Sequence, residues 1–321
     1  MTAASNVIPM QTRESSVPEL SGVVPAFPWM GGKGWLAEKI RHQMPRNVCY
    51  VEAFAGAAAM LLALPPAPVE ILNDRNDGLV NFYRVLQNPQ WRKDLIERLE
   101  WTPYSRTEYA RLLARCQELE RKHKDHGLTT SERQEWAWAF FYVANATFSG
   151  GGQTGLTDKR FATSTDRSQG RRARYHLDGL PKLALRLRHV VVENLPALDI
   201  LVKYDSNHTL FFLDPPYYPD TRAILHEKSR GTYEGGEMDA VQHHELLAMC
   251  RRLQGMVALC GYAHPDYDDA LLPHGWKTLS FPRKALSSLH RDKERASREE
   301  RVWLNPPLAE HFARNRQVSL F

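Results

Sequence analysis

The sequence predicts an α/β protein built on a doubly wound, mostly parallel sheet of seven strands. Short runs rich in β-branched and aromatic residues recur along the chain, and several are almost entirely apolar, which is typical of strands buried on both faces of a parallel sheet. Helix-like segments separate some of these runs, and that alternation indicates a doubly wound fold. The expected strands are 47–54, 69–74, 189–194, 208–216, 255–262, 276–281 and 301–305, and the expected helices between them are 35–44, 78–86 and 239–252.

One stretch, residues 91–187, interrupts this alternation. It has no convincing strand, but helical patterns appear around 107–123 and 131–147, followed by a Gly-rich loop at 149–155 and a basic segment. We therefore expect a mostly helical insertion between early and late strands of one sheet.

The chain accordingly divides into one large domain, one insertion and two terminal tails. The first residues are polar and show no usable periodicity, and the last residues follow a polar stretch. We predict a flexible tail at 1–22, a catalytic domain formed by 23–90 and 188–306, the helical insertion at 91–187, and a C-terminal tail at 307–321.

Length and composition are those of an ordinary globular protein. The 321 residues suffice for one large α/β domain with an insertion, and 43% are hydrophobic and 25% charged. No apolar run approaches the ~18–20 residues that span a bilayer, and no charged start precedes an apolar stretch, so we expect neither a membrane segment nor a secretory signal. The four cysteines lack metal-ligand spacing, which predicts a reducing cytoplasm without disulfides or zinc.

The distribution of charge favours a polyanionic partner. The net charge of +5 is weak evidence by itself, but nine Lys and Arg residues stand against two acids between residues 159 and 188. We expect this segment to bind nucleic acid. The charged stretch 290–301 fits a loop or hairpin at the rim of such a site, or equally a solvated surface.

The most informative run is LFFLDPPYY, residues 210–218. An apolar strand delivers Asp214 at its carboxyl end, and the two prolines stiffen the loop because their φ is fixed and they have no N–H. A carboxylate and a backbone carbonyl that each accept one hydrogen of an aryl amine free its lone pair, and a tyrosine offers a face for a base to stack on. A Pro-rich turn without function would not explain a carboxylate beside an aromatic residue. We predict catalytic roles for Asp214, Pro215, Pro216 and Tyr217.

LDPPYY resembles the Asp-Pro-Pro-Tyr motif of amino-methyltransferases that act on DNA. The order of motifs along the chain resembles the Dam-type (D12 class, alpha group) DNA N6-adenine methyltransferases, in pieces that extend from about residue 25 to residue 305. The resemblance implies that the insertion 91–187 recognises a DNA target. It also implies site-specific transfer of a methyl group from S-adenosylmethionine to the N6 amine of a flipped-out adenine.

Three motifs imply where S-adenosylmethionine binds. FPWMGGKGWLAEKI (27–40) resembles the amino-terminal motif of the family, and YVEAFAGAAAM (50–60) resembles a strand-to-helix turn whose glycine admits the methionine moiety. ILNDRN (71–76) resembles the second-strand motif whose acid binds the ribose hydroxyls. The cofactor-binding residues implied by these matches and by the catalytic motif are Trp29, Lys33, Glu52, Phe54, Gly56, Asp74, Asn76 and Asp214.

The resemblance also implies a DNA-binding region. FFYVANATFSGGG (140–152) resembles the start of the recognition region, and EERVWLN (299–305) resembles the last strand. Ala53, Ala58 and Ala146 stand where relatives usually have Pro, Gly and Arg, so a GATC target is not assumed. With the basic segment, the match implies DNA contacts by Asn145, Lys159, Arg160, Arg171, Arg172 and Arg174.

Two other functions stay open at this point. An N4-cytosine DNA methyltransferase would use the same cofactor, although Asp rather than Ser before Pro-Pro-Tyr favours adenine. A relative that binds DNA without catalysis is the second, against which the intact Asp214, Tyr217 and Asp74 argue. Methyl transfer from a sulfonium needs no metal, and His243 and His244 lack a third ligand at metal spacing, so no metal is expected.

The expected partners are double-stranded DNA and the replication sliding clamp. The last five residues, QVSLF, resemble the short clamp-binding peptide of many bacterial DNA-processing proteins, which implies contacts by Gln317, Leu320 and Phe321. A frayed end, or a tail folded back on the core, is the alternative. The expected location is the cytoplasm of a bacterial or phage-infected cell, in association with the nucleoid.

Overall fold

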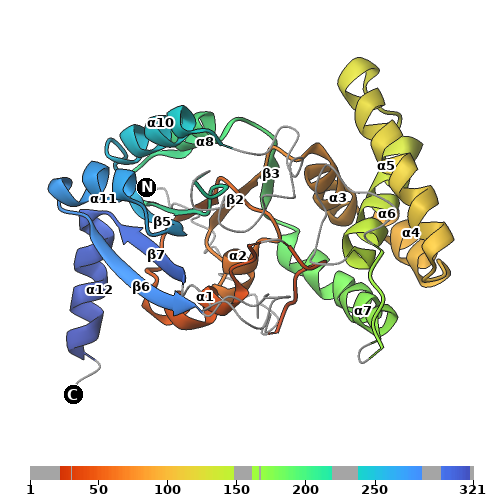
Figure 1. Cartoon of the computed structure of the whole chain (residues 1–321), viewed down its shortest axis with the longest axis horizontal. Coiled ribbons are helices and arrows are strands. Elements are labelled where there is room, and N and C mark those ends of the chain that lie inside the picture. Colours follow the sequence, from red (N-terminus) through yellow and green to blue (C-terminus); the bar gives the residue numbers. More distant parts are fainter. Residues whose placement is uncertain are drawn as a thin grey trace, which may run out of the picture.

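Seven strands form one sheet in the computed structural model. The structure describes residues 22–29, 31–147, 161–165, 168–218, 238–283 and 298–318. Within these ranges it does not describe the side chains of residues 283, 298 and 316–318. The strands are β1 (Cys49–Glu52), β2 (Val69–Asn73), β3 (Val191–Glu193), β4 (Thr209–Leu213), β5 (Met256–Tyr262), β6 (Lys277–Arg283) and β7 (Arg298–Leu304). Their order across the sheet is β3-β2-β1-β4-β5-β7-β6 (Figure 1). The first five are parallel, and β7 is antiparallel to both of its neighbours. The predicted fold class is confirmed.

Helices cover both faces of the sheet, and alternate strand residues point to each face. Leu210 and Phe212 lie in one core cluster, whereas Phe211 and Leu213 lie in the other. The first cluster includes residues of α1 (Gly34–Ile40), α2 (Ala59–Ala63), α3 (Asp77–Gln87) and α12 (Pro306–Val318). The second includes residues of α8 (Ala197–Tyr204), α10 (Ala240–Cys250) and α11 (Pro265–Leu271).

Four further helices gather at one side of the molecule, beside α3 and the β3 edge of the sheet (Figure 1). They are α4 (Pro89–Glu100), α5 (Arg106–His126), α6 (Thr130–Ala146) and α7 (Gln169–Leu187). Between residues 91 and 187 the described residues contain no strand and only the isolated bridge of Thr147 with Phe161. The helical character that we expected for this segment is therefore present.

Polar side chains at the N-termini explain where several helices begin. The first backbone N–H groups of a helix lack partners within it, and a short polar side chain supplies one. Thr129 and Glu132 bond each other's backbone in a capping box at α6, and Asp239 and Gln242 do the same at α10. Side-chain caps also begin α3, α4, α5 and α7, at Asn76, Asn88, Ser105 and Ser168.

Helix α7 was not predicted, because its cationic residues and an internal proline, Pro181, obscured the pattern. Its buried residues include Leu177, Leu180, Ala184 and Leu187, which recur at the spacing of one helical face. Not all of its cations are exposed. The guanidinium of Arg186 is buried and donates to both carboxylate oxygens of Glu70, at 2.5 and 2.6 Å, so it ties α7 to β2. Arg186 is thus a structural member of the basic segment.

The structure corrects the expectation for the C-terminal tail. Residues 306–318 form α12, and Leu308 and Phe312 are buried against the core cluster that contains α1 and β7. The segment is helical because it carries apolar residues at four-residue spacing. Residues 319–321, with Leu320 and Phe321, lie outside the described residues, as do residues 1–21 of the predicted N-terminal tail.

Among the described residues, none of the helices combines the length and the apolar character needed to cross a membrane.

The turn from β1 into α2 has a tightly constrained backbone. Gly56 has φ +47°, and a Cβ added there would lie 2.7 Å from Nε1 of the Trp29 indole. Ala58, at the position where relatives have a second glycine, adopts the left-handed conformation with φ +56°. That conformation costs a residue with a side chain ~1–2 kcal/mol. The turn therefore combines backbone strain with close packing of an aromatic ring.

Gly56→Ala is expected to lower the free energy of unfolding by about 2 kcal/mol or more, since the new methyl group meets both a positive φ and the Trp29 ring. Gly34→Ala is the matched control, because no atom lies within 4 Å of a Cβ placed there and helix α1 begins at this residue. Urea unfolding should show a loss for the first variant only. Equal stability of the two variants would mean that this turn is not constrained as described.

Candidate functional site

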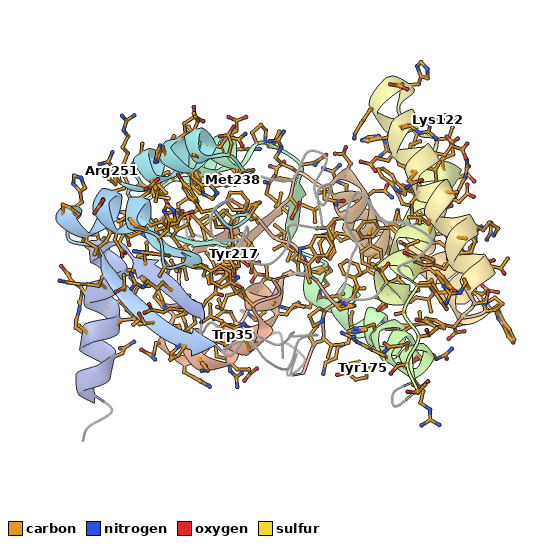
Figure 2. The ribbon with its side chains drawn as sticks, viewed as in Figure 1. Trp35, Lys122, Tyr175, Tyr217, Met238 and Arg251 are labelled. Atoms are coloured by element: carbon orange, nitrogen blue, oxygen red, sulfur yellow. The ribbon has the colours of Figure 1, made fainter. Side chains whose placement is uncertain are left out.

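The predicted catalytic loop lies at the point where the order of strands reverses. From β1 the chain builds outward to β2 and β3, and β4 then pairs with the other side of β1. Ligands of open α/β sheets bind beyond the carboxyl ends of strands at such a point. Asp214 follows β4 directly, and Glu52 ends the adjacent β1. Figure 2 shows Tyr217 near the centre of the view, with Tyr175 of α7 and Lys122 of α5 toward its edge.

A buried lysine holds the catalytic loop. Lys33 is 3% exposed, and its ammonium group lies 2.6 Å from Oδ1 of Asp214 and 3.3 Å from Oε1 of Glu300. It also donates to the hydroxyl oxygen of Tyr217, at 2.6 Å, and to the carbonyl of Gly31, at 3.2 Å. Tyr217 in turn donates its O–H to Glu300, whose oxygens lie at 2.8 and 3.0 Å. We call Lys33, Asp214, Tyr217 and Glu300 the lysine cluster.

The electrostatics of the lysine cluster keep its lysine charged. Burial acts to lower the pKa of Lys33, but Asp214, Tyr217 and Glu300 outweigh it and hold that pKa well above its ordinary value. Burial raises the pKa of Asp214 and of Glu300, and the charge of Lys33 opposes both shifts. The cation is therefore protonated at neutral pH, with two carboxylates against it.

Only one carboxylate of the cluster is open to a ligand. The side chain of Asp214 is 21% exposed, whereas that of Glu300 is fully buried. Lys33 bonds one oxygen of Asp214, and no described group bonds the other. Asp214 can therefore accept a hydrogen bond from a molecule in the crevice while Lys33 holds it in place.

Contacts with neighbouring side chains hold both tyrosines of the loop, Tyr217 and Tyr218, in place. The rings of Tyr217 and Tyr262 lie with centroids 4.3 Å apart. The next residue, Tyr218, donates its hydroxyl to Asp266 at 2.6 Å and stacks on His264 with centroids 3.8 Å apart. These contacts restrict the loop at both tyrosines, so the position of Asp214 does not depend on Lys33 alone.

Asp74 and Gly56 lie together at the end of β2. The Asp74 carboxylate accepts the backbone N–H of Gly56 and of Asn76, both at 2.9 Å. Burial raises the pKa of Asp74, and these backbone bonds oppose the shift. Each oxygen still has a free lone pair, so the carboxylate can also accept from hydroxyls of a ligand. Trp29 lies against Gly56, which brings the amino-terminal motif to the same place.

Other predicted cofactor residues have structural contacts. Glu52 accepts the hydroxyl of Tyr50 at 2.9 Å and the N–H of Leu61 at 2.6 Å, and burial raises its pKa to about 8. Asn76 caps α3. The half-buried Phe54 packs against the core.

Asn145 has structural contacts. This residue is 5% exposed, and its amide donates to the carbonyls of Ala26 and Phe141, at 3.1 and 3.0 Å. It joins α6 to the segment before the amino-terminal motif. Its predicted contact with DNA stays a prediction.

The other predicted DNA contacts differ in placement. Arg171, Arg172 and Arg174 are exposed on α7. Arg174 lies 3.0 Å from Asp178 and 3.7 Å from Glu100, so part of its charge is compensated. Lys159 and Arg160 lie outside the described residues.

Glu300 was missed, because residues 290–301 were interpreted as a charged rim or a solvated surface. Glu300 shares one face of β7 with Val302 and Leu304, which are buried in a core cluster. A carboxylate in register with inward-facing apolar residues is the signal that could have found it.

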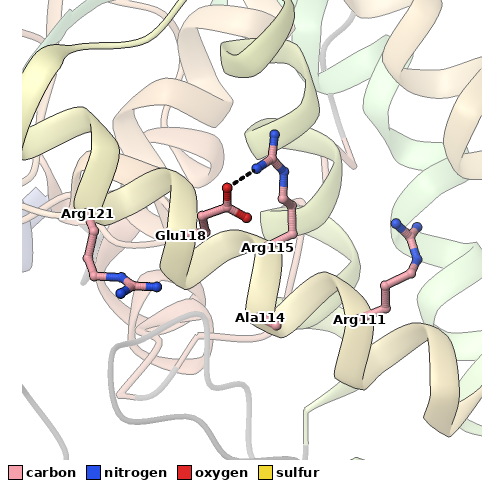
Figure 3. Close-up of a pocket in the computed structure, with 5 residues that line it drawn as sticks. All are labelled: Arg111, Ala114, Arg115, Glu118 and Arg121. Atoms are coloured by element: carbon pink, nitrogen blue, oxygen red, sulfur yellow. Dashed lines mark ion pairs between the residues drawn. The ribbon is translucent and has the colours of Figure 1, made fainter.

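A hollow away from the lysine cluster lies on α5 and is lined by Arg111, Ala114, Arg115, Glu118 and Arg121 (Figure 3). Its cations are largely compensated: Arg115 lies 2.6 Å from Glu118 and 2.7 Å from Glu135, and Arg111 pairs with Glu108. The charged groups of this hollow are therefore less available to a ligand than those of the lysine cluster. Among the described residues no group of three or more His, Cys, Asp or Glu side chains could hold a metal ion.

Comparison with protein families agrees with this geometry. The model of the D12 class N6 adenine-specific DNA methyltransferases matches residues 29–254, which is more than half of the chain. A search among curated proteins gave no match. The matched segment begins at Trp29 and contains Lys33 and Asp214, which pair at the switch point of the sheet, and Asp74 at the end of β2. The chain belongs to the D12 class N6 adenine-specific DNA methyltransferase family.

Proposed function

We propose that this protein methylates the N6 amine of adenine at specific sites in duplex DNA, with S-adenosylmethionine as the methyl donor. The observation that carries the proposal is Asp214, a partly exposed carboxylate at the carboxyl end of β4, held by the buried Lys33 at the switch point. The membership of an adenine-specific family favours adenine over the N4 amine of cytosine.

The residues around Asp74 fit the donor. Asp74 would accept the ribose hydroxyls, and Trp29 and Phe54 offer apolar surface beside it. Gly56 supports this assignment, since a Cβ there would collide with Trp29 and close the turn. When bound, S-adenosylmethionine supplies a methyl group on an already activated sulfonium.

The chain's own residues would orient the acceptor amine. Asp214 and the carbonyl of Pro215 each accept one amine hydrogen, which leaves the nitrogen lone pair free. Tyr217, anchored by its hydroxyl, presents a ring of fixed orientation for the base to stack on. No side chain needs to form a covalent bond, so proximity and orientation supply most of the acceleration. Because the amine is inaccessible within a duplex, adenine has to flip into the site.

We assign target recognition to residues 91–187. The exposed Arg171, Arg172 and Arg174 on α7 support this role, because they can contact phosphates. We also propose that the enzyme acts on bacterial or phage DNA in the cytoplasm.

Asp214→Ala should abolish methyl transfer to DNA, because the amine loses its charged acceptor. Nucleoside analysis by mass spectrometry of DNA treated with enzyme and donor should show N6-methyladenine for wild type and for the control Asp199→Ala, an exposed residue of α8. Activity of the Asp214 variant within tenfold of wild type, about 1.4 kcal/mol in the barrier, would refute this role. N4-methylcytosine as the product, or no product from wild type, would refute the proposed function.

Replacing Arg171, Arg172 and Arg174 together with Gln should weaken DNA binding and flatten its dependence on salt. The log–log salt slope is expected to fall by about one unit for each phosphate that an arginine no longer neutralises. Arg46, Arg252 and Arg314 are exposed arginines outside residues 91–187, and their triple Gln variant is the control. Fluorescence anisotropy at several salt concentrations gives both slopes. Equal slopes for the two triple variants would make the α7 cations an ordinary solvated surface.

We also propose that the chain end binds the sliding clamp through Gln317, Leu320 and Phe321. Only the sequence supports this contact, and the helical backbone of α12 continues through residue 317. The last turn therefore has to open for an extended peptide to bind, which leaves micromolar affinity at best. Surface plasmon resonance should detect clamp binding by the full chain and not by a variant that ends at Arg316. Equal signals from both would exclude the contact.

A further inference from the structure

We infer that Glu300 makes the site selective for a cationic methyl donor over its neutral product. Its carboxylate prevents Lys33 and Asp214 from forming a neutral pair, and leaves a net negative charge beside the crevice. This inference rests on the proposed function, because it concerns the charge of the donor. Glu300 lies beyond the segment that the family model matches, so the match does not assign it a role.

Glu300 is buried and makes specific contacts with its neighbours. Its side chain is fully buried on β7, a position where an ionised carboxylate persists only with partners. Both oxygens accept from the hydroxyl of Tyr217, and one lies 3.3 Å from the ammonium of Lys33. Glu300 therefore contacts both Lys33 and Tyr217 and is not exposed to solvent.

The charges within the lysine cluster do not cancel. Lys33 contributes one positive charge, and Asp214 and Glu300 contribute two negative charges. Among the described residues no second Lys or Arg pairs with either carboxylate. The neighbouring Arg301 is turned to the other face of β7, where it pairs with Asp268 and Glu299. With both carboxylates ionised, the lysine cluster as a whole has a charge of about −1.

This excess charge distinguishes the donor from the product. A sulfonium carries one positive charge, whereas the thioether left after methyl transfer is neutral and otherwise almost identical in shape. Charges in a site partly shielded from water interact strongly over several ångströms. A net negative cluster therefore favours the sulfonium and the positive charge that develops on the acceptor amine, and gives no such benefit to the thioether. Without Glu300, the Lys33–Asp214 pair would be close to neutral.

A merely structural Glu300 would behave differently. If it only anchored Tyr217 and Lys33, its loss would disturb the crevice and weaken both ligands alike. Glu300→Gln separates these cases, because it keeps the length of the side chain and an oxygen acceptor for the Tyr217 hydroxyl but removes the charge. Glu300→Asp retains the charge while shortening the side chain, and thus tests geometry alone.

The experiment is calorimetric titration of the full-length protein with S-adenosylmethionine and, separately, with S-adenosylhomocysteine. Glu300→Gln should weaken binding of the sulfonium about tenfold or more and change binding of the thioether by less than about twofold. Glu300→Asp should keep the wild-type ratio of the two dissociation constants, even where both constants rise. The control is Glu299→Gln, which removes a carboxylate from the adjacent, 39% exposed side chain and should alter neither constant.

Equal losses for both ligands in Glu300→Gln, or an unchanged ratio, would overturn the inference and leave the proposed function intact. A ratio that changes as much in Glu300→Asp as in Glu300→Gln would also overturn it, since charge would then not be the cause. If wild type bound neither ligand, the proposed methyl donor itself would be wrong, and the inference would fail with it.

Discussion

A buried ammonium group needs anionic partners, and at Lys33 this requirement joins three distant parts of the chain. Without them its burial would cost several kcal/mol. Lys33 precedes α1, Asp214 and Tyr217 follow β4, and Glu300 lies on β7, yet all four groups meet within hydrogen-bonding or ion-pairing distance. The amino-terminal motif, the catalytic loop and the antiparallel end of the sheet are therefore held in one arrangement. A substitution at Lys33 removes a contact of Asp214 and of Glu300 at once.

The same constraint divides the lysine cluster into side chains that are held in place and one carboxylate that can contact a ligand. Lys33 and Glu300 are buried and satisfied, Tyr217 is held by its hydroxyl, and Asp214 is the carboxylate of the lysine cluster that is partly exposed. In the proposed function a flipped base would not have to order the Tyr217 ring, because contacts of its hydroxyl already fix it. On the other side of β1, Asp74 fixes the turn at Gly56 through backbone bonds and retains acceptor capacity. Asp214 and Asp74 are thus two anchored carboxylates on either side of β1, and we propose that one serves the acceptor and the other the donor.

Much of the fold and part of the site could be predicted from the sequence. Apolar runs marked the strands because residues such as Phe211 and Phe212 are buried on opposite faces of a parallel sheet. Motifs identified Lys33, Asp74 and Asp214, because each stands at a strand end or beside a glycine turn. Their contacts could not be predicted: Glu300 and Asn145 owe their roles to segments far away in the chain. Arg186 belongs to the basic segment by sequence, and its buried pairing with Glu70 could likewise not be predicted.

The central claim is that one cation compensates two carboxylates, and unfolding free energies measure it most directly. Lys33→Met should destabilise the protein by about 3–5 kcal/mol, since it leaves Asp214 and Glu300 buried without a cation. Adding Glu300→Gln to Lys33→Met should restore part of that loss, although Glu300→Gln alone destabilises. Urea unfolding of wild type, both single variants and the double variant gives the interaction energy, which we expect to exceed ~1 kcal/mol. Losses that add within ~0.5 kcal/mol would show that Lys33 and Glu300 do not depend on each other, and would contradict the account.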